Sequence, residues 1–374
     1  MKNIVVLGAG MVGSAIARDL SKNFSVTSVD LNKTALDFLK KDFAVNTIVA
    51  NLKDKKKIQS AIAKADLVIG AVPGFMGFET CKTVIEAGKN IVDISFFPED
   101  AFELDALAKK KKVTAVVDCG VAPGMDNILL GYHFSRMQVD SFTCMVGGLP
   151  FKRTLPFQYK APFSPIDVIE EYTRPARLIE NHEMVTKPAL SEPDLVEFEN
   201  IGTLEAFNTD GLRSLMHTMR VRNMKEQTLR YPGHRLLMEN LRDAGMFGTE
   251  EVEVNGKKVR PLDVTSKILL PQWKLQPEEE EFTVMRIIIS GKEKGKKKTY
   301  TYDLFDRYDA ATKLSSMART TGYTCTAVAN LVANKQFTRK GIIAPEMIGE
   351  EENAFLFILN YLKERGVNYK KSVS

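Results

Sequence analysis

The chain has 374 residues, of which 44% are hydrophobic and 26% are charged, and its formal net charge is +5. This length predicts two domains of a globular protein, and the modest charge argues against a nucleic-acid partner. No apolar run reaches the roughly 18 residues of a membrane span. Four scattered cysteines without metal-ligand spacing predict buried thiols in a reducing compartment and no metal. Because a strand begins almost at once, we expect no signal peptide and a cytoplasmic protein.

Residues 1–30 predict a nucleotide-binding βαβ unit. Ile4–Leu7 is a short β-branched run that ends in the glycine loop Gly8–Gly13. Apolar residues then recur at helical spacing, and a second strand, Ser25–Val29, closes on Asp30. A glycine motif alone is weak, but one that follows a strand, opens a helix and precedes such an acid is specific.

Each glycine of this loop has an expected task. Gly8 allows the tight turn, Gly10 lets the backbone approach a pyrophosphate, and Gly13 lets helix and strand pack closely. The backbone of Met11 and Val12 then presents helix N-terminal N–H groups to the phosphates. Asp30 accepts hydrogen bonds from ribose hydroxyls and repels a 2′-phosphate, which favours NAD over NADP. Lys33 is close enough in sequence to soften that repulsion.

The strand and helix alternation continues to about residue 120. Strands are expected at Thr47–Ala50, Leu67–Val72, Ile91–Ser95 and Val113–Val117, with helices at Ile58–Ala65, Glu79–Ala87 and Asp100–Lys110. Ligands bind outside the carboxyl ends of such parallel strands. We therefore expect cofactor contacts from the residues at these ends, which are Asn51 (toward the adenine amino group), Ala71, Val72, Pro73 and Cys119.

Beyond about residue 125 the pattern changes to strands with period-two alternation. Strands are expected at Ser141–Val146, Val252–Val254, Phe282–Ser290 and Thr299–Leu304, and helices at Ile166–Tyr172, Arg235–Ala244, Ala311–Asn330 and Glu351–Arg365. Asn255-Gly256 predicts a hairpin turn, and a second hairpin at 293–295 accounts for the basic run Lys292–Lys298.

The predicted fold class is therefore α/β, a Rossmann-like doubly wound parallel sheet, plus an α+β second domain with a mainly antiparallel sheet. We place an NAD-binding domain at residues 1–122 and a substrate-binding and dimerisation domain at 123–310. Helices within 311–374 are expected to pack back on the first domain.

Several later motifs, in order along nearly the whole chain, resemble the saccharopine dehydrogenase-like family. They are Asp118–Gly124, Val146–Pro150, Leu204–Phe207, Thr228–His234 and Met317–Tyr323. Ala122 and Val146 stand where glutamate-forming members carry an aspartate and a cysteine, and they match the family's lysine 6-dehydrogenases. Phe75-Met76 and the segment Phe207–Arg213 depart from that group.

The resemblance implies NAD-dependent oxidative deamination of the ε-amine of L-lysine or a related amino acid, by a homodimer joined through the second domain. The alternatives are a saccharopine reductase or dehydrogenase, which makes or cleaves a secondary amine between two amino acids, and a non-catalytic NAD sensor.

Candidate residues for the chemistry follow from what an amino-acid dehydrogenase must do. Arg230 matches the family position that binds the substrate carboxylate, Tyr231 adjoins it, and Arg213 is a second candidate. The amine must lose a proton before hydride leaves the carbon. Asp118 is the expected proton acceptor, and Asp93 is the alternative. Of the histidines, His234 has the best claim to face the cleft.

Overall fold

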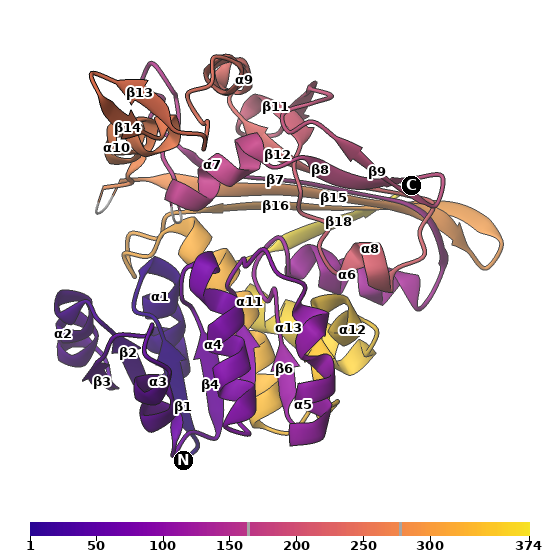
Figure 1. Ribbon diagram of the computed structural model, residues 1–374. Helices are drawn as coiled ribbons and strands as arrows, with labels where there is room; N and C mark the ends of the chain where they lie inside the picture. The colour runs from indigo at the N-terminus through magenta and orange to yellow at the C-terminus, as the bar shows by residue number, and fades with distance from the viewer. Residues whose placement is uncertain (163–164, 277–278) are drawn as a thin grey trace. The chain divides into compact units, whose positions relative to one another are not determined.

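The computed structural model describes residues 1–162, 165–276 and 279–374. The chain divides into two compact units, residues 1–136 with 317–368 and residues 137–316 with 369–374 (Figure 1). The division falls after residue 136, later than the boundary expected at residue 122. The reason is helix α6 (Met125–Phe134), which packs within the first unit against α12 (Pro345–Gly349). A Cβ on Gly131 would lie 2.0 Å from the Glu346 carbonyl oxygen, so this helix pair touches backbone to backbone.

The first unit is built on a parallel sheet, which is seven-stranded in the described part of the chain and has the order β17-β6-β5-β4-β1-β2-β3. Its strands are β1 (Asn3–Leu7), β2 (Ser25–Asp30), β3 (Val45–Val49), β4 (Leu67–Gly70), β5 (Asn90–Asp93), β6 (Thr114–Val116) and β17 (Gly341–Ile343). β1 lies between β4 and β2, the point at which the strand order reverses. The predicted doubly wound sheet is confirmed, with its topological switch point at the end of β1.

Helices cover this sheet. They are α1 (Met11–Leu20), α2 (Lys33–Asp42), α3 (Lys55–Ile62), α4 (Gly74–Glu86), η1 (Ala101–Leu104), α5 (Asp105–Lys111), α11 (Ser316–Ala333) and α13 (Glu352–Glu364). One apolar core joins strand residues such as Val5 and Leu7 to Ile58 of α3 and Val84 of α4. The predicted helix at Ala311–Asn330 begins only at Ser316, because residues 309–314 form turns and an isolated bridge.

The C-terminal helices are tied to α1 by one buried carboxylate. Asp19 accepts hydrogen bonds from Thr326 Oγ1 at 2.8 Å and Tyr361 Oη at 2.7 Å. Arg365 Nε donates to both Asp19 oxygens, at 3.0 and 2.9 Å. Because a buried charge is costly unless it is paired and hydrogen-bonded, this cluster fixes α11 and α13 on α1.

The second unit is built on a mixed sheet, which has nine strands among the described residues. A path β10-β11-β12-β7-β15-β16-β18 is joined by β8 on β12 and β9 on β8. The strands are β7 (Gln138–Pro150), β8 (Ala176–Glu180), β9 (Glu183–Lys187), β10 (Asp194–Phe198), β11 (Gly202–Asn208), β12 (Asn223–Arg230), β15 (Glu281–Glu293), β16 (Lys296–Arg307) and β18 (Tyr369–Val373). Only β7 and β12 pair in parallel along it. The predicted, mainly antiparallel second sheet is confirmed.

Helices α7 (Pro165–Thr173), α9 (His234–Asp243) and α10 (Pro261–Trp273) cover one face of this sheet (Figure 1). Their buried side chains, including Tyr172, Met238 and Trp273, join sheet residues such as Leu204 and Phe282 in a second core. The short helix α8 (Leu215–Thr218) lies between β11 and β12 in the chain. No helix in the described ranges is both long enough and apolar enough to cross a membrane.

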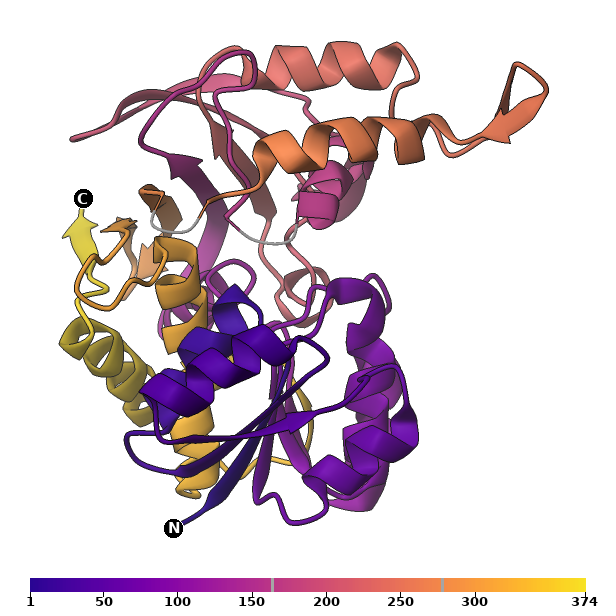
Figure 2. The same cartoon turned by 90° about the vertical axis from the view of Figure 1, so that its left-hand side faces the viewer.

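Both predicted hairpins are present. β13 (Val252–Val254) and β14 (Lys257–Val259) form a separate two-stranded ribbon whose turn residues Asn255 and Gly256 have positive φ. Figure 2 shows this ribbon, in orange, reaching away from the helix α10 that follows it. The turn between β15 and β16 places Lys294 and Gly295 at φ +50° and +79°, so the basic run lies on the predicted hairpin, where Lys298 pairs with Glu293.

Candidate functional site

The glycine loop joins β1 to α1 in the conformation that the sequence predicts. Gly8 has φ +114°, and a Cβ there would lie 2.2 Å from the Ala71 carbonyl oxygen. A Cβ on Gly13 would lie 2.3 Å from the Gly8 carbonyl oxygen. These two glycines are therefore required by close backbone packing.

Gly10 differs from the other two glycines. It is the N-cap of α1, has φ −68°, and has no atom within 4 Å of where its Cβ would lie. No side chain caps this helix end, which leaves its N–H groups available, with Met11 exposed beside them. An open backbone approach to an uncapped helix N-terminus suits the pyrophosphate of a dinucleotide.

Asp30 is the next element of the predicted cofactor site, at the end of β2. Its Oδ2 accepts a hydrogen bond from the Ala9 N–H at 2.6 Å, and its Oδ1 accepts from the Asn32 N–H at 2.7 Å. The carboxylate thus holds the glycine loop while staying half-exposed. Lys33 is turned to Asp37, with Nζ 2.6 Å from Oδ2.

Asn51 follows β3 and is exposed. Its Oδ1 accepts from the Lys53 N–H at 3.0 Å, so the side chain already closes its own turn. A carbonyl oxygen has two lone pairs and can accept a second hydrogen bond, as from an adenine amino group. The adenine contact of Asn51 stays a prediction.

The turn after β4, Ala71–Pro73, packs against the loop after β5. A Cβ on Gly74 would lie 2.4 Å from the Phe96 carbonyl oxygen, and one on Gly77 would lie 2.6 Å from Ser95 Cβ. Ser95 Oγ donates to the Val72 carbonyl oxygen at 3.0 Å. The Ala71–Pro73 turn and the loop after β5 therefore pack as one unit, here called the ledge. This ledge lies beside the glycine loop, because the Ala71 N–H donates to the Leu7 carbonyl oxygen at 2.9 Å.

Two carboxyl groups lie at the ends of β5 and β6. Asp93 is fully buried, and burial raises the pKa of its carboxyl to about 8, with nearby Asp118 adding to the rise. Asp118 is 5% exposed and has φ +52°, a backbone region that aspartate tolerates. The backbone N–H of Cys119 donates to the Asp93 carbonyl oxygen at 2.9 Å. Burial raises the pKa of the Cys119 thiol, which keeps it neutral.

A third buried carboxyl, Asp126, is not predicted by the sequence motifs. It stands in the first turn of α6, where its Oδ1 accepts from the Gly124 N–H at 2.9 Å. Burial raises the pKa of Asp126 to about 7, and Glu346 contributes to the rise. The Asn127 amide donates to Glu346 Oε2 at 2.9 Å. The signal available in the sequence is an acid two residues after Gly124, at a helix start.

In the second unit, Arg230 ends β12 and its side chain is only 2% exposed. Its Nη2 lies 2.5 Å from Glu171 Oε2, its Nε donates to Tyr172 Oη at 3.2 Å, and its Nη1 donates to the Leu229 carbonyl oxygen at 3.0 Å. The guanidinium also stacks on the Tyr159 ring at 4.5 Å. Arg230 is therefore a buried cation, and most of its donors already have partners on its own chain.

His234 extends this network. Its Nδ1 lies 2.8 Å from the Phe157 carbonyl oxygen, which can only accept, so Nδ1 carries the hydrogen. Its Nε2 then accepts from Tyr172 Oη at 2.9 Å. Burial and the charge of Arg230 lower the pKa of His234 to about 3. The imidazole is therefore a neutral, buried part of the Arg230 cluster.

The remaining predicted substrate residues also have structural partners. Tyr231 is buried, and its hydroxyl donates to the Pro150 carbonyl oxygen at 3.0 Å. Arg213 is 9% exposed, with φ +50°. Asp210, its neighbour in sequence, is held by Arg177 through two contacts of 2.8 Å, from Nε to Oδ1 and from Nη2 to Oδ2. Their contacts with substrate stay predictions.

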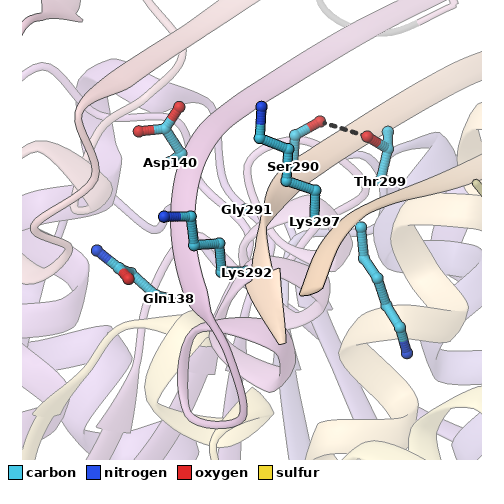
Figure 3. Close-up of a pocket in the computed structure, with 8 residues that line it drawn as sticks. Gln138, Asp140, Ser290, Gly291, Lys292, Lys297 and Thr299 are labelled. Carbon is cyan, nitrogen blue, oxygen red and sulfur yellow. Dashed lines mark hydrogen bonds between the residues drawn. The ribbon is translucent and has the colours of Figure 1, made fainter. Parts of the chain in front are cut away.

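An open hollow of about 390 Å³ lies on the second unit, at the start of β7 and beside the β15–β16 hairpin (Figure 3). Its lining is polar and includes Asp140, Lys292 and Lys297, with Ser290 hydrogen-bonded to Thr299 at 3.0 Å. No predicted site residue lines it, so we do not assign the chemistry to it. Within the ranges described, no three His, Cys, Asp or Glu side chains converge as a metal site.

The fold and the glycine loop together define a dinucleotide-binding protein of the Rossmann class. The family model of the saccharopine dehydrogenase NADP binding domain matches residues 4–116, and that of the saccharopine dehydrogenase C-terminal domain matches residues 120–367. The chain belongs to the saccharopine dehydrogenase family. These matches point to a nicotinamide dinucleotide as the cofactor of the first unit.

Curated relatives are distant. The mitochondrial α-aminoadipic semialdehyde synthase of Rattus norvegicus is 26% identical over 49% of this chain and 21% of its own length. An NADP(+)-dependent, L-glutamate-forming saccharopine dehydrogenase of Pyricularia oryzae is 24% identical over 72% of this chain and 63% of its own. This chain thus spans less than two thirds of the length of these curated relatives. The apo L-Glu-forming saccharopine dehydrogenase structure from Saccharomyces cerevisiae covers 100% of both chains, with a TM-score of 0.82 and 19% identity, a likeness of fold.

Proposed function

We propose that this chain is a nicotinamide-dependent oxidoreductase that acts on a carbon–nitrogen bond of an amino acid. The observation that carries the proposal is the open Gly10 position at the uncapped start of α1, inside a chain matched in order by both family models. Asp30 and Asp93 end parallel strands of the same sheet, and Asp118 follows the end of β6 by two residues, which supports a ligand site along that edge.

The names of the relatives favour a secondary amine between two amino acids as the substrate. The relatives similar in sequence are named saccharopine dehydrogenases and α-aminoadipic semialdehyde synthases. We therefore propose saccharopine or a close analogue as the first candidate. Oxidation would give an imine, which water splits into an amino acid and a carbonyl compound.

In this proposal the first unit would hold a nicotinamide, which would supply the hydride acceptor for the carbon that bears nitrogen. Asp118 takes the proton from the substrate nitrogen, so that its lone pair can form the imine. The Ala71–Pro73 turn and the Cys119 backbone border the cofactor. Arg230 orients a substrate carboxylate, a role that requires exchange with the Glu171 carboxylate now on its Nη2.

The ε-amine of L-lysine is the second candidate substrate. Ala122 and Val146 stand where glutamate-forming members carry an aspartate and a cysteine. The lack of these two polar side chains favours the smaller substrate. The two candidates differ in whether the nitrogen links one amino acid or two.

A substrate panel tests the function. The full chain is mixed with NAD or NADP and with saccharopine, L-lysine, L-glutamate or cadaverine, and reduced cofactor is followed by absorbance. We expect turnover with saccharopine, with L-lysine as the second candidate. A chain that binds the cofactor tightly but reduces it with none of these amines would instead be a non-catalytic sensor.

We also propose NAD as the preferred cofactor, although the family model and the fungal relatives are named for NADP. The support is the half-exposed Asp30 carboxylate, held in place by the Ala9 and Asn32 N–H groups. A 2′-phosphate near that oxygen would meet a negative charge, and Lys33 is already paired with Asp37.

Asp30→Asn tests this preference, because it removes the charge and keeps one acceptor oxygen, while its NH2 group loses one of the two bonds from the Ala9 and Asn32 N–H groups. We expect the ratio of kcat/KM for NAD to that for NADP to fall by about tenfold, which corresponds to ~1.4 kcal/mol. Lys33→Ala is the matched control and should leave the ratio nearly unchanged. A wild-type preference for NADP would overturn the role given to Asp30 and follow the relatives instead.

We further propose a homodimer formed through the second unit. The β13–β14 ribbon supports it, since Val252 and Val254 are 47% and 52% exposed on a ribbon that belongs to no larger sheet. An isolated two-stranded ribbon is marginal in water, so a covering partner would stabilise it.

A further inference from the structure

The carboxyl of Asp93 is held in place by close packing and by hydrogen bonds. It lies against Gly70, where a Cβ would come within 1.8 Å of its Oδ2. Any side chain at position 70 would displace it. The Ser95 N–H donates to Asp93 Oδ1 at 2.7 Å, and the Cys81 thiol donates to the same carboxyl. This geometry fixes both carboxyl oxygens at the base of the ledge.

Ser95 links this carboxyl to the Ala71–Pro73 turn. Its hydroxyl oxygen lies 3.0 Å from the Val72 carbonyl oxygen and 3.3 Å from Asp93 Oδ2. A serine hydroxyl has one hydrogen and can donate it to only one of these two oxygens. A carbonyl oxygen cannot donate, so the Val72 bond exists only when Ser95 gives its hydrogen to Val72. The contact between Ser95 and Asp93 then needs a hydrogen supplied by Asp93.

We propose that Asp93 is a positioning residue that stays protonated, donates to Ser95 Oγ, and thereby directs the Ser95 hydrogen to the Val72 carbonyl oxygen. These two hydrogen bonds, from Asp93 to Ser95 and from Ser95 to Val72, fix the turn that would border the nicotinamide. This inference rests on the proposed function in one respect only, namely that the group bordering the Ala71–Pro73 turn is a nicotinamide. It also gives Asp93 a role other than proton acceptor.

The surroundings favour the neutral acid. The groups that face Asp93 are Asp118 from the end of β6, the thiols of Cys81 on α4 and Cys325 on α11, and Cys119. None of these four is a cation. A second negative charge beside Asp118 is therefore disfavoured, in addition to the cost of burial. Ionisation of Asp93 would draw the Ser95 hydrogen away from Val72 and loosen the turn.

Three variants of the full chain test the proposal. Asp93→Asn keeps a donor to Ser95 and should retain most of the wild-type kcat. Asp93→Ala and Ser95→Ala interrupt the hydrogen bonds from Asp93 through Ser95 to Val72. Each should lower kcat by about tenfold, the effect of one misdirected hydrogen bond. Ser21→Ala is the matched control, since it removes a hydroxyl that donates to the Arg18 carbonyl oxygen at the far end of α1.

The pH profile separates this role from a structural one. The wild-type kcat should fall as pH rises through about 8, where the Asp93 carboxyl ionises, and Asp93→Asn should lose that step. An Asp93→Asn variant as inactive as Asp93→Ala would overturn the proposal, because it would mean that Asp93 works as a carboxylate.

An infrared difference spectrum tests the protonation without turnover. At pH 7 the spectrum of wild type minus Asp93→Asn should contain the carbonyl band of a protonated carboxylic acid, because the contribution of Asp126 cancels, and this band should be shifted in Ser95→Ala. A spectrum of wild type minus Asp93→Asn without such a band would refute the protonated acid. This result holds even if no amine in the substrate panel is oxidised, so the two proposals fail separately.

Discussion

Gly10→Ala is expected to fold as stably as wild type and to bind NAD or NADP at least about tenfold more weakly. Its backbone, with φ −68°, is open to alanine, and no atom lies within 4 Å of the new methyl group. Stability should therefore be untouched. The methyl group would fill the space through which the pyrophosphate approaches the start of α1.

Gly8→Ala is the matched comparison. Here φ is +114° and the new Cβ would lie 2.2 Å from the Ala71 carbonyl oxygen. Backbone strain of this kind costs ~1–3 kcal/mol, and the clash adds to it, so this variant should lose stability. Thermal denaturation and calorimetric titration with the cofactor distinguish the two cases. A Gly10→Ala variant with wild-type affinity would exclude a dinucleotide phosphate from this position.

Arg230→Met should destabilise the protein by ~1–3 kcal/mol, the usual cost of leaving buried hydrogen-bonding groups without their partner, since the Glu171 side chain is 26% exposed. The change leaves the carboxylate of Glu171 and the hydroxyl of Tyr172 without the guanidinium that now bonds them. Denaturant unfolding measures this loss. Arg260→Met, which breaks an exposed pair with Asp263, is the control and should change stability far less.

Loss of activity in Arg230→Met would therefore not by itself assign carboxylate binding. Glu171→Gln separates the two roles, because it keeps Arg230 and removes the charge that competes for its Nη2. A lower KM for the amino-acid substrate is expected if Arg230 binds the substrate carboxylate. An unchanged KM with lower stability would leave Arg230 a purely structural cation.

The first sheet was largely predictable because short runs rich in β-branched residues alternate with helical segments through its first six strands. The seventh strand, β17, was not predictable. It has three residues, Gly341–Ile343, and pairs with Thr114–Val116 of β6, more than two hundred residues earlier in the chain. So short a run carries no periodic signal, and only tertiary packing selects it.

The second sheet shows a different limit. Period-two patterning and turn residues predict hairpins, and β13–β14 and β15–β16 are hairpins. The parallel pairing of β7 with β12 has no local signal, because the intervening strands β8 to β11 return the chain to the same side.

The local structure of the candidate site was predictable where backbone chemistry demands a residue type, as at Gly8 and Gly13 of the glycine loop. Side-chain partners that come from distant segments were not. Glu171, Tyr172 and Tyr159 surround Arg230 from α7 and the loop before it, and no spacing in the sequence links them to β12. The same holds for Glu346 beside Asn127.

The late position of β17 and the Asp19 cluster has a consequence for synthesis on the ribosome. Residues 317–368 complete the first unit, and β18 closes the edge of the second sheet at β16. Until they emerge, β6 remains an open edge strand and Asp19 lacks Thr326, Tyr361 and Arg365. Translation must therefore outpace aggregation at that edge, and stalling before residue 341 should leave a nascent chain dependent on chaperones.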